Sequence, residues 1–283
     1  MAYQLKFRNK QLKLIAVDLD GTLLRDDKTI SEVDMATLEM LGREGIIRVA
    51  ATGRSMHKVE EVLMAGTPID YVVFSSGAGI FNWNEKKLLH SEQFAPHVAA
   101  NVCRHLYEEN FNFFVYQPIP HNNLFLYHKG AGNCVEFSNY LERHKGDFSV
   151  LPDCSHVCKS GQFMAIVPNN DSLFEQLKND IHADCDGVRV IRATSPVNDK
   201  FTWIEIFPEA VSKGHGLKWL CDKLELRYSE TVGIGNDFND LDMFEFVGHP
   251  FLLKNGVDAL KLKFQSVDFT NNENGFSAVV QSL

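Results

Sequence analysis

The stretch that decides the fold is 12-LKLIAVDLDGTLLRDD-27. Its first part, residues 12–19, is a short apolar run of the kind expected for a β-strand buried on both faces of a sheet. Two carboxylates, Asp18 and Asp20, stand at the end of this run, immediately before a glycine. Like charges this close repel each other unless a cation lies between them or one is protonated. The stretch therefore predicts a strand that ends in a functional site.

The residues that follow alternate between helical and strand patterns. Helices are predicted at residues 31–42, where Ser31 offers an N-cap, and at 55–64. Apolar strands are predicted at 46–52 and 70–76. Strands and helices that alternate with short connections are typical of a parallel α/β sheet, so we expect the Rossmann-like class of fold.

The pattern changes after Gly79 and returns near the C-terminal third of the chain. In between lie hairpin-like and aromatic strand patterns with separate helices, which indicate an α+β unit. We therefore expect one α/β core domain formed by residues 1–82 and 208–283, with an α+β domain inserted at residues 83–207.

Length and charge limit the classes of protein that this sequence can encode. The chain has 283 residues, of which 45% are hydrophobic, and a formal net charge of −9. Such an acidic chain is not suited to coating nucleic acid, because that affinity rests on Lys and Arg neutralising phosphates. No apolar run reaches the roughly 18 residues of a membrane span, and no signal-peptide core follows the first residues. We expect a cytoplasmic protein with neither membrane nor nucleic-acid partners.

Polar residues stand where four of the predicted strands end. They are Asp18, Thr52, Ser75 with Ser76, and the run Gly235–Asp237. Open parallel sheets bind ligands beyond the carboxyl ends of their strands, so these residues are expected at one edge. Asp18 and Asp20 lie on the same side of an extended chain, where both can face one ion. Mg²⁺ suits this arrangement, because it is a hard ion that prefers oxygen ligands.

Four motifs, in order along the chain, resemble those of the haloacid dehalogenase superfamily. They are DLDGT (18–22), TGR (52–54), a lone lysine in VSKG (211–214) and GNDFND (235–240). The insertion between the second and third motifs looks like the type IIB (C2B) cap of the Cof-like sugar phosphatases. Three further stretches are similar to parts of that family, namely SSGA (75–78), LKNGVDALK (253–261) and FTNNENGF (269–276).

The resemblance implies hydrolysis of a phosphomonoester through a covalent aspartyl phosphate. Asp18 is then the nucleophile, and Asp20 is the acid that protonates the leaving alcohol and the base that activates water. Thr52 and the backbone N–H of Gly53 bind phosphoryl oxygens. Lys213, at the start of a helix, adds a positive charge and is expected to pair with the carboxylate at position 240.

The resemblance also implies a magnesium site and a set of substrate contacts. The expected metal ligands are Asp18, Asp20, Asn236 and Asp237. The expected substrate-binding residues are Gly21, Gly53, Arg54, Ser76, Gly77, Asn239 and Asn255.

Two positions depart from the family's pattern. Asn236 stands where the family usually has a metal-binding Asp, and Asp237 follows it at once. Either Asn236 offers Mg²⁺ an uncharged oxygen or Asp237 takes over as the ligand. Ser76 replaces the usual Asn, which shortens a polar side chain near the expected phosphate site.

The sequence thus predicts a Mg²⁺-dependent phosphatase for a small phosphorylated metabolite, such as a sugar phosphate, acting as a monomer or small homo-oligomer. The inserted domain is expected to close over the site and select the leaving group. Two alternatives stay open. A phosphotransferase or mutase would use the same intermediate on Asp18, and a non-catalytic phosphometabolite-binding protein could tolerate Asn236 and Ser76.

Overall fold

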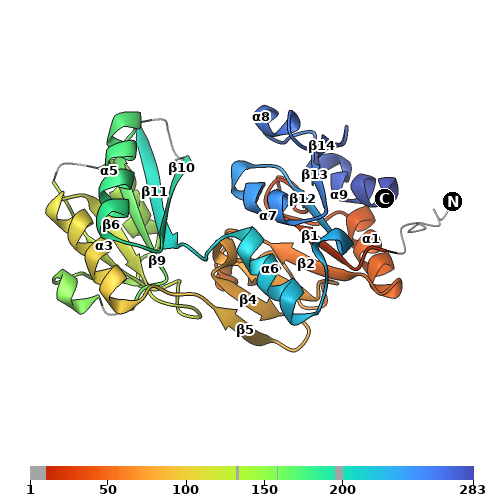
Figure 1. Cartoon of the computed structure of the whole chain (residues 1–283), viewed down its shortest axis with the longest axis horizontal. Coiled ribbons are helices and arrows are strands. Elements are labelled where there is room, and N and C mark those ends of the chain that lie inside the picture. The colour runs from red at the N-terminus through yellow and green to blue at the C-terminus, as the bar shows by residue number, and fades with distance from the viewer. Residues whose placement is uncertain (1–10, 132–133, 158, 195–199) are drawn as a thin grey trace. The chain divides into compact units, whose positions relative to one another are not determined.

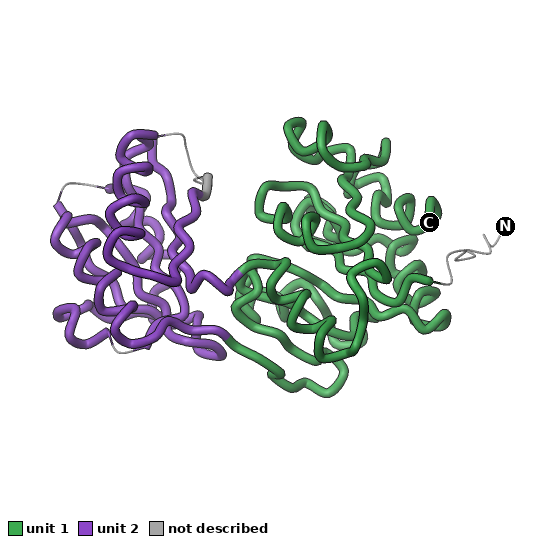
Figure 2. Tube along the Cα trace, in the orientation of Figure 1, with its two compact units in different colours: residues 1–91, 212–283 green, residues 92–211 purple. Residues whose placement is uncertain are grey.

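The computed structural model of the protein describes residues 11–131, 134–157, 159–194 and 200–283. The chain divides into two compact units, one formed by residues up to Ser91 with Ser212–Leu283 and the other by Glu92–Val211 (Figure 2). The sequence places these boundaries at 82/83 and 207/208. The first boundary lies later in the structure because a hairpin extends the sheet of the first unit as far as Ser91.

The first unit is built on a mostly parallel sheet. Its strands are β1 (Leu14–Val17), β2 (Ile47–Ala51), β3 (Tyr71–Phe74), β4 (Gly79–Asn82), β5 (Lys87–Ser91), β12 (Thr231–Gly235), β13 (His249–Leu252) and β14 (Gln265–Ser266). They are ordered β14-β13-β12-β1-β2-β3-β4-β5 (Figure 1). Neighbours from β14 to β3 are parallel, whereas β3-β4 and β4-β5 are antiparallel. This is the predicted Rossmann-like α/β core.

Helices cover the sheet of the first unit. They are α1 (Glu32–Arg43), α2 (Met56–Glu60), α6 (Lys213–Lys223), α7 (Leu241–Phe246), α8 (Asp258–Lys261) and α9 (Gly275–Ser282). The predicted N-cap of α1 is confirmed, because the Ser31 hydroxyl accepts the N–H of Asp34. Ser212 caps α6 in the same way, accepting the N–H of His215, so α6 begins at Lys213.

The central strand β1 is buried on both faces, as its apolar sequence predicts. Leu14 and Ala16 pack into the cluster that includes side chains of α6 and α7, whereas Ile15 and Val17 point to the opposite face. All four are at most 1% exposed. Because β1 pairs in parallel with both β12 and β2, the residue that follows it emerges at the carboxyl edge between the ends of two other strands.

The second unit is a separate α+β structure with its own core. Its strands are β6 (Asn112–Tyr116), β7 (Phe125–His128), β8 (Phe148–Val150), β9 (Gln162–Pro168), β10 (Val188–Thr194) and β11 (Phe201–Pro208), and its helices are α3 (Pro96–Glu108), α4 (Val135–Arg143) and α5 (Asp171–Asp184). The strand order is β10-β11-β9-β6-β7-β8. One face packs against α3 and α5 and the other against α4, so the adjacent Phe113 and Phe114 belong to different clusters.

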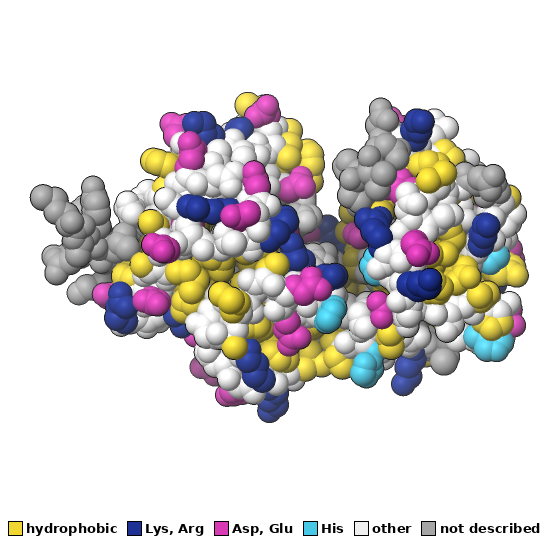
Figure 3. Space-filling model, turned by 180° about the vertical axis from the view of Figure 1, so that it is seen from behind, with side chains coloured by type: hydrophobic (Ala, Val, Ile, Leu, Met, Phe, Trp, Pro, Cys, Tyr) yellow, Lys and Arg dark blue, Asp and Glu magenta, His cyan; other side chains and the backbone are white. Residues whose placement is uncertain are grey.

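Acidic and basic side chains are interspersed on the face of the protein drawn in Figure 3. Among the described residues, every helix is too short or too polar to cross a lipid bilayer.

One carboxylate of the second unit lies in an unfavourable place. Glu205, on β11, is partly buried beside the Gln162 amide, whose Nε2 donates to its Oε1 over 3.3 Å. Burial raises the pKa of Glu205 to about 7 from an ordinary value of 4.5, although the hydrogen bond from Gln162 opposes this. The ionised form of Glu205 therefore costs folding free energy.

We expect Glu205→Gln to stabilise the protein at about pH 8 and to change little at about pH 4. Because the pKa is higher in the folded state, the free energy of unfolding falls as pH rises from about 4.5 to about 7 and stays lower above that. Thermal unfolding at both pH values measures this, with Glu209→Gln as a control that removes an exposed carboxylate. A variant melting below the native protein at the higher pH would contradict it.

Candidate active site

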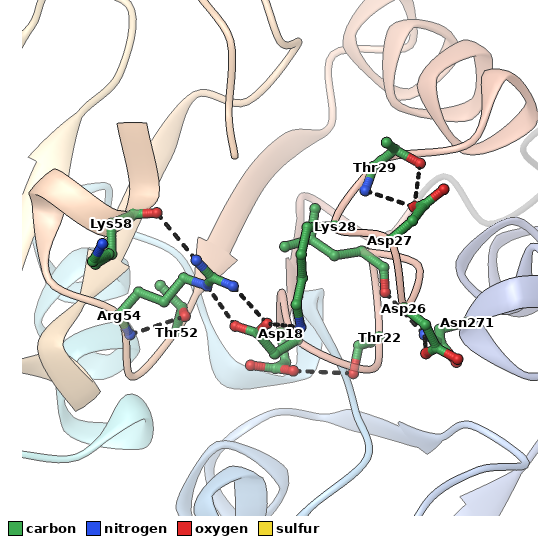
Figure 4. A network of polar contacts seen from close by, with 12 residues as sticks. Asp18, Thr22, Asp26, Asp27, Lys28, Thr29, Thr52, Arg54, Lys58 and Asn271 are labelled. Atoms are coloured by element: carbon green, nitrogen blue, oxygen red, sulfur yellow. Dashed lines mark hydrogen bonds and ion pairs between the residues drawn. The ribbon is translucent and has the colours of Figure 1, made fainter. Parts of the chain in front are cut away.

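The site begins with Asp18, which follows β1 directly. Its backbone N–H still donates to the carbonyl of Ile234, so the sheet fixes the position of this residue. The residue is only 4% exposed. Its Oδ1 accepts from Lys213 Nζ at 2.6 Å. Its Oδ2 accepts from the Thr22 hydroxyl at 3.1 Å (Figure 4). The orientation of the carboxylate is therefore set on both of its oxygens.

Lys213 connects two buried carboxylates. It is 1% exposed, and its Nζ also donates to Asp240 Oδ1 at 2.7 Å. The other oxygen of Asp240 accepts the backbone N–H groups of Asn236 and Asp237 at 2.9 and 3.1 Å. The pairing of Lys213 with Asp240 is the one expected from the sequence, and the same carboxylate also shapes the loop after β12.

Burial and charge act in opposite directions on the pKa values of Asp18 and Lys213. Burial raises the pKa of Asp18 to about 7, in spite of the opposing charge of Lys213. Burial alone would lower the pKa of Lys213, but the charges of Asp18 and Asp240 outweigh it and hold the pKa above its usual value. Lys213 is therefore held in its charged form, and its ammonium group lies between the carboxyl groups of Asp18 and Asp240.

Asp20 lies at the same edge but has different partners. Arg54 donates to both of its oxygens, from Nε at 2.6 Å and from Nη2 at 2.7 Å, and Lys28 Nζ donates at 2.8 Å. Partial burial alone would raise the pKa of Asp20, but the hydrogen bonds from Arg54 and Lys28 lower it to about 2. The carboxylate of Asp20 is thus held ionised between two cations.

A strained turn supports the TGR motif from the neighbouring strand. After β3, Ser75, Ser76 and Gly77 have φ values of 48°, 55° and 100°, a left-handed conformation that non-glycine residues rarely adopt. In this conformation the N–H of Ser76 donates to the carbonyl of Thr52 at 3.0 Å. A Cβ at Gly77 would lie 2.0 Å from the Ser212 carbonyl oxygen, so glycine is required where the turn meets the start of α6.

Oxygen atoms gather at the corner between the first and fourth motifs. The Thr22 hydroxyl lies 3.1 Å from Asp18 Oδ2 and 3.0 Å from Asn236 Oδ1, but its single hydrogen can serve only one of them. Gly21 makes this approach possible, because a Cβ there would lie 2.6 Å from the amide nitrogen of Asn236. The two oxygens that converge here suit a hard divalent cation.

The structure gives other partners to several residues predicted from the sequence. The carboxylate of Asp237 accepts the N–H of Phe238 and caps a short turn, and Asn239 is exposed. Asp20 is engaged with Arg54, and the roles of Asp20 and Asp237 as metal ligands stay predictions. Asn255 donates to the carbonyl of Gly21 at 2.8 Å. Among the described residues, no cluster of three or more His, Cys, Asp or Glu side chains forms a metal site.

Two residues that contact the site were not predicted individually from the sequence. Lys28 reaches Asp20 from a turn in which it adopts a φ of 67°, a conformation that the sequence RDDKT gives little reason to expect. Asn271 contacts the loop after β1 from the far end of the chain, and the sequence signals it only as part of FTNNENGF (269–276), a stretch that is similar to part of the family.

The fold and the site define a class of hydrolase with an aspartate at the end of the central strand. The sequence profile described as haloacid dehalogenase-like hydrolase matches residues 15–280, and the chain belongs to this family. The family predicted from the motifs is therefore confirmed, and so is the prediction of an enzyme.

Individual relatives match over nearly their whole length. Phosphatase YwpJ of Bacillus subtilis is 26% identical, over 96% of this chain and 100% of its own. The 5-amino-6-(5-phospho-D-ribitylamino)uracil phosphatase YwtE of the same organism is 24% identical, over 96% and 98%. The crystal structure of TM0651 from Thermotoga maritima superposes with a TM-score of 0.74 at 25% identity, covering 96% of this chain and 97% of that one.

We expect Lys213→Met to lower the free energy of unfolding by roughly 3–5 kcal/mol, because it leaves two buried carboxylates without their cation. Chemical denaturation measures the loss. Lys218→Met is the matched control, since Lys218 pairs with Asp222 on the exposed surface of the same helix. If the two variants lost equally little stability, the buried lysine would not have the structural role described here.

Proposed function

We propose that the protein is a Mg²⁺-dependent phosphatase that hydrolyses small phosphorylated metabolites, with sugar phosphates as the preferred substrates, through an aspartyl phosphate on Asp18. The observation that carries this proposal is the buried Asp18 carboxylate, oriented by Lys213 and Thr22 at the carboxyl edge of the sheet. A carboxylate held in one orientation by two partners is prepared to attack the phosphorus atom of a bound substrate.

In the first step, a carboxylate oxygen of Asp18 forms a bond to phosphorus while the bond from phosphorus to the leaving oxygen breaks. The leaving alkoxide needs a proton, and Asp20 is the group proposed to supply it. A phosphate dianion that arrives beside Asp20 favours its protonated form, because like charges raise the pKa of a carboxyl group. The phosphate dianion also competes with Asp20 for hydrogen bonds from the guanidinium of Arg54.

In the second step, water attacks the phosphorus of the aspartyl phosphate, and Asp18 is released as a carboxylate. Asp20 then serves as the base that takes a proton from this water. The structure has Asp20 in the form that this step needs, since Arg54 and Lys28 keep it ionised. The same carboxylate can therefore act in both steps with its proton moving in opposite directions.

Residues of the neighbouring motifs are suited to hold the phosphoryl group. The Thr52 hydroxyl oxygen accepts the N–H of Arg54 at 3.1 Å, which leaves its hydrogen to donate to a phosphoryl oxygen. The backbone of Gly53 is exposed beside it, and Ser76 lies across from Gly53. Lys213 adds the positive charge that an otherwise acidic protein must supply locally.

The residues fit Mg²⁺, with Asp18 and Asn236 as the protein ligands. Their oxygens converge on a hydroxyl that can serve only one of them, and a cation next to Asp18 favours its ionised form. When bound, Mg²⁺ would neutralise negative charge on the transferring phosphoryl group. We assign the ligand role to Asn236 over Asp237, because the carboxylate of Asp237 is committed to the N–H of Phe238.

We expect Asp18→Asn to abolish nearly all Mg²⁺-dependent hydrolysis of p-nitrophenyl phosphate and to leave the protein folded. The amide keeps the shape of the side chain and removes the attacking charge. Release of nitrophenol and of inorganic phosphate is measured with and without Mg²⁺, and a panel of phosphorylated metabolites extends the assay to substrates. Asp222→Asn, at an exposed position on α6, controls for the substitution itself. Full activity of Asp18→Asn would overturn the assignment of the nucleophile.

Replacing Asn236 by Asp should tighten Mg²⁺ binding by about 10-fold, because it adds a negative charge to a site with one carboxylate ligand. Calorimetric titration of both proteins with Mg²⁺ measures the change without turnover. An unchanged or weaker affinity would mean that Asn236 is not a ligand.

A further inference from the structure

A short C-terminal segment contacts the loop that carries the two catalytic aspartates. This segment, Thr270–Asn274, will be called the asparagine segment. The amide of Asn271 donates to the carbonyl of Leu24 at 3.0 Å and to the carboxylate of Asp26 at 3.1 Å (Figure 4). Asn271 is 3% exposed, so its hydrogen bond to the buried Leu24 carbonyl is shielded from water.

Two neighbouring asparagines of the segment also bind residues of the loop after β1. Asn272 and Asp26 bond reciprocally, with the Asn272 amide donating to the carboxylate at 2.8 Å and the Asp26 N–H donating back at 3.2 Å. Arg25 donates to the side-chain oxygen of Asn274 at 3.3 Å. Three asparagines of the segment, Asn271, Asn272 and Asn274, therefore hold the loop after β1.

Asn255 links the same segment to the turn beside the nucleophile. Its amide nitrogen donates to the carbonyl of Gly21 at 2.8 Å, and its amide oxygen accepts the backbone N–H of Asn271 at 3.3 Å. Both ends of the side chain are thus engaged with the protein. This geometry differs from the substrate contact that the sequence leads us to expect at Asn255.

The residues that these asparagines contact are connected through the backbone to Asp20 and to Thr22, the partner of Asp18. Asp20 and Leu24 form a β-bridge, so a restraint on Leu24 is also a restraint on Asp20. Farther along the loop, the Arg25 N–H donates to the carbonyl of Thr29 at 2.8 Å, which closes the turn that presents Lys28 to the Asp20 carboxylate. On the other side, Gly21 directly precedes Thr22, which orients Asp18.

We propose that Asn255 and the asparagine segment are positioning elements for catalysis, which hold the loop of residues 18–29 in the geometry that aligns Asp18 and Asp20. This inference rests on the proposed function. None of these asparagines needs to touch the substrate: Asn255 acts on the carbonyl of Gly21, and Asn271 acts on the carbonyl of Leu24. A small displacement of a catalytic group is enough to lower a rate substantially, so such restraints have kinetic effects.

The test is the variant Asn255→Leu, which keeps the size of the side chain and removes both hydrogen bonds without adding charge. We expect kcat for p-nitrophenyl phosphate to fall about 10-fold, with KM and the inhibition constant of inorganic phosphate changed by less than about two-fold. Asn84→Leu is the matched control, because Asn84 makes a similar exposed hydrogen bond, to Asp70, and should keep all three constants. A raised KM with unchanged kcat would show that Asn255 contacts the substrate and would overturn the proposal, as would no change in any constant.

Hydrogen–deuterium exchange makes the test independent of turnover. In Asn255→Leu, the peptide that covers residues 19–29 should exchange faster than in the native protein, while the peptides of β2 and β3 should not change. Unaltered exchange in residues 19–29 would overturn the anchoring, even if the protein hydrolysed no phosphate ester. Conversely, faster exchange in a protein that is inactive from the outset would count against the proposed function alone.

A second variant keeps the proposal testable if Asn255→Leu does not fold. Asn272→Ala removes the exposed reciprocal bonds to Asp26 at the other end of the network. It should speed exchange in the same peptide and lower kcat with KM unchanged. Native exchange and native kcat in Asn272→Ala would overturn the role of the asparagine segment.

Discussion

The structure of the site depends on one buried cation between two buried carboxylates. Lys213 donates to Asp18 at 2.6 Å and to Asp240 at 2.7 Å, and all three side chains are almost inaccessible to water. A buried charge is tolerated only when it is paired, so none of the three can be removed without cost to the others. The interaction joins the end of β1, the start of α6 and the loop after β12, and thereby brings together motifs that lie 195 residues apart.

Basic side chains also lie at this edge of an otherwise acidic protein, and each of them is paired with an aspartate. The chain carries a net charge of −9, but Lys213, Arg54 and Lys28 are gathered at one edge of the sheet. Asp18 and Asp20, which are two residues apart, have different environments at this edge. Asp18 is buried and has a raised pKa, whereas Asp20 is half-exposed between two cations and has a lowered one. Environments that separate the pKa values of neighbouring carboxyl groups are suited to the separate roles of nucleophile and acid–base that we propose.

Much of this could be predicted from the sequence, because it depends on local patterns. The apolar run before Asp18, the cap at Ser31, the helix that begins at Lys213, and the position of polar residues after β1, β2, β3 and β12 are all confirmed. The strands β8 and β14 were not predicted, since three and two residues carry too little pattern, and β13 was not predicted because its sequence HPFL contains a proline, which argues against a strand. The partners of Asp20 and Asn255 also lay beyond the sequence. The partner of Asp20 depends on the left-handed backbone at Lys28. The partners of Asn255 depend on contacts between the loop after β1 and the asparagine segment, which is 247 residues away in the sequence and is brought close only by folding.

The proposed mechanism requires a phosphoryl group that is covalently bound to Asp18 during turnover. The most direct measurement is rapid acid quenching of the enzyme during turnover, followed by mass spectrometry of its peptides. We predict that the peptide containing Asp18 carries one additional phosphoryl group, which disappears as substrate is exhausted. A phosphoryl group found on a different residue, or hydrolysis at full rate with no phosphorylated peptide at any time, would contradict the account.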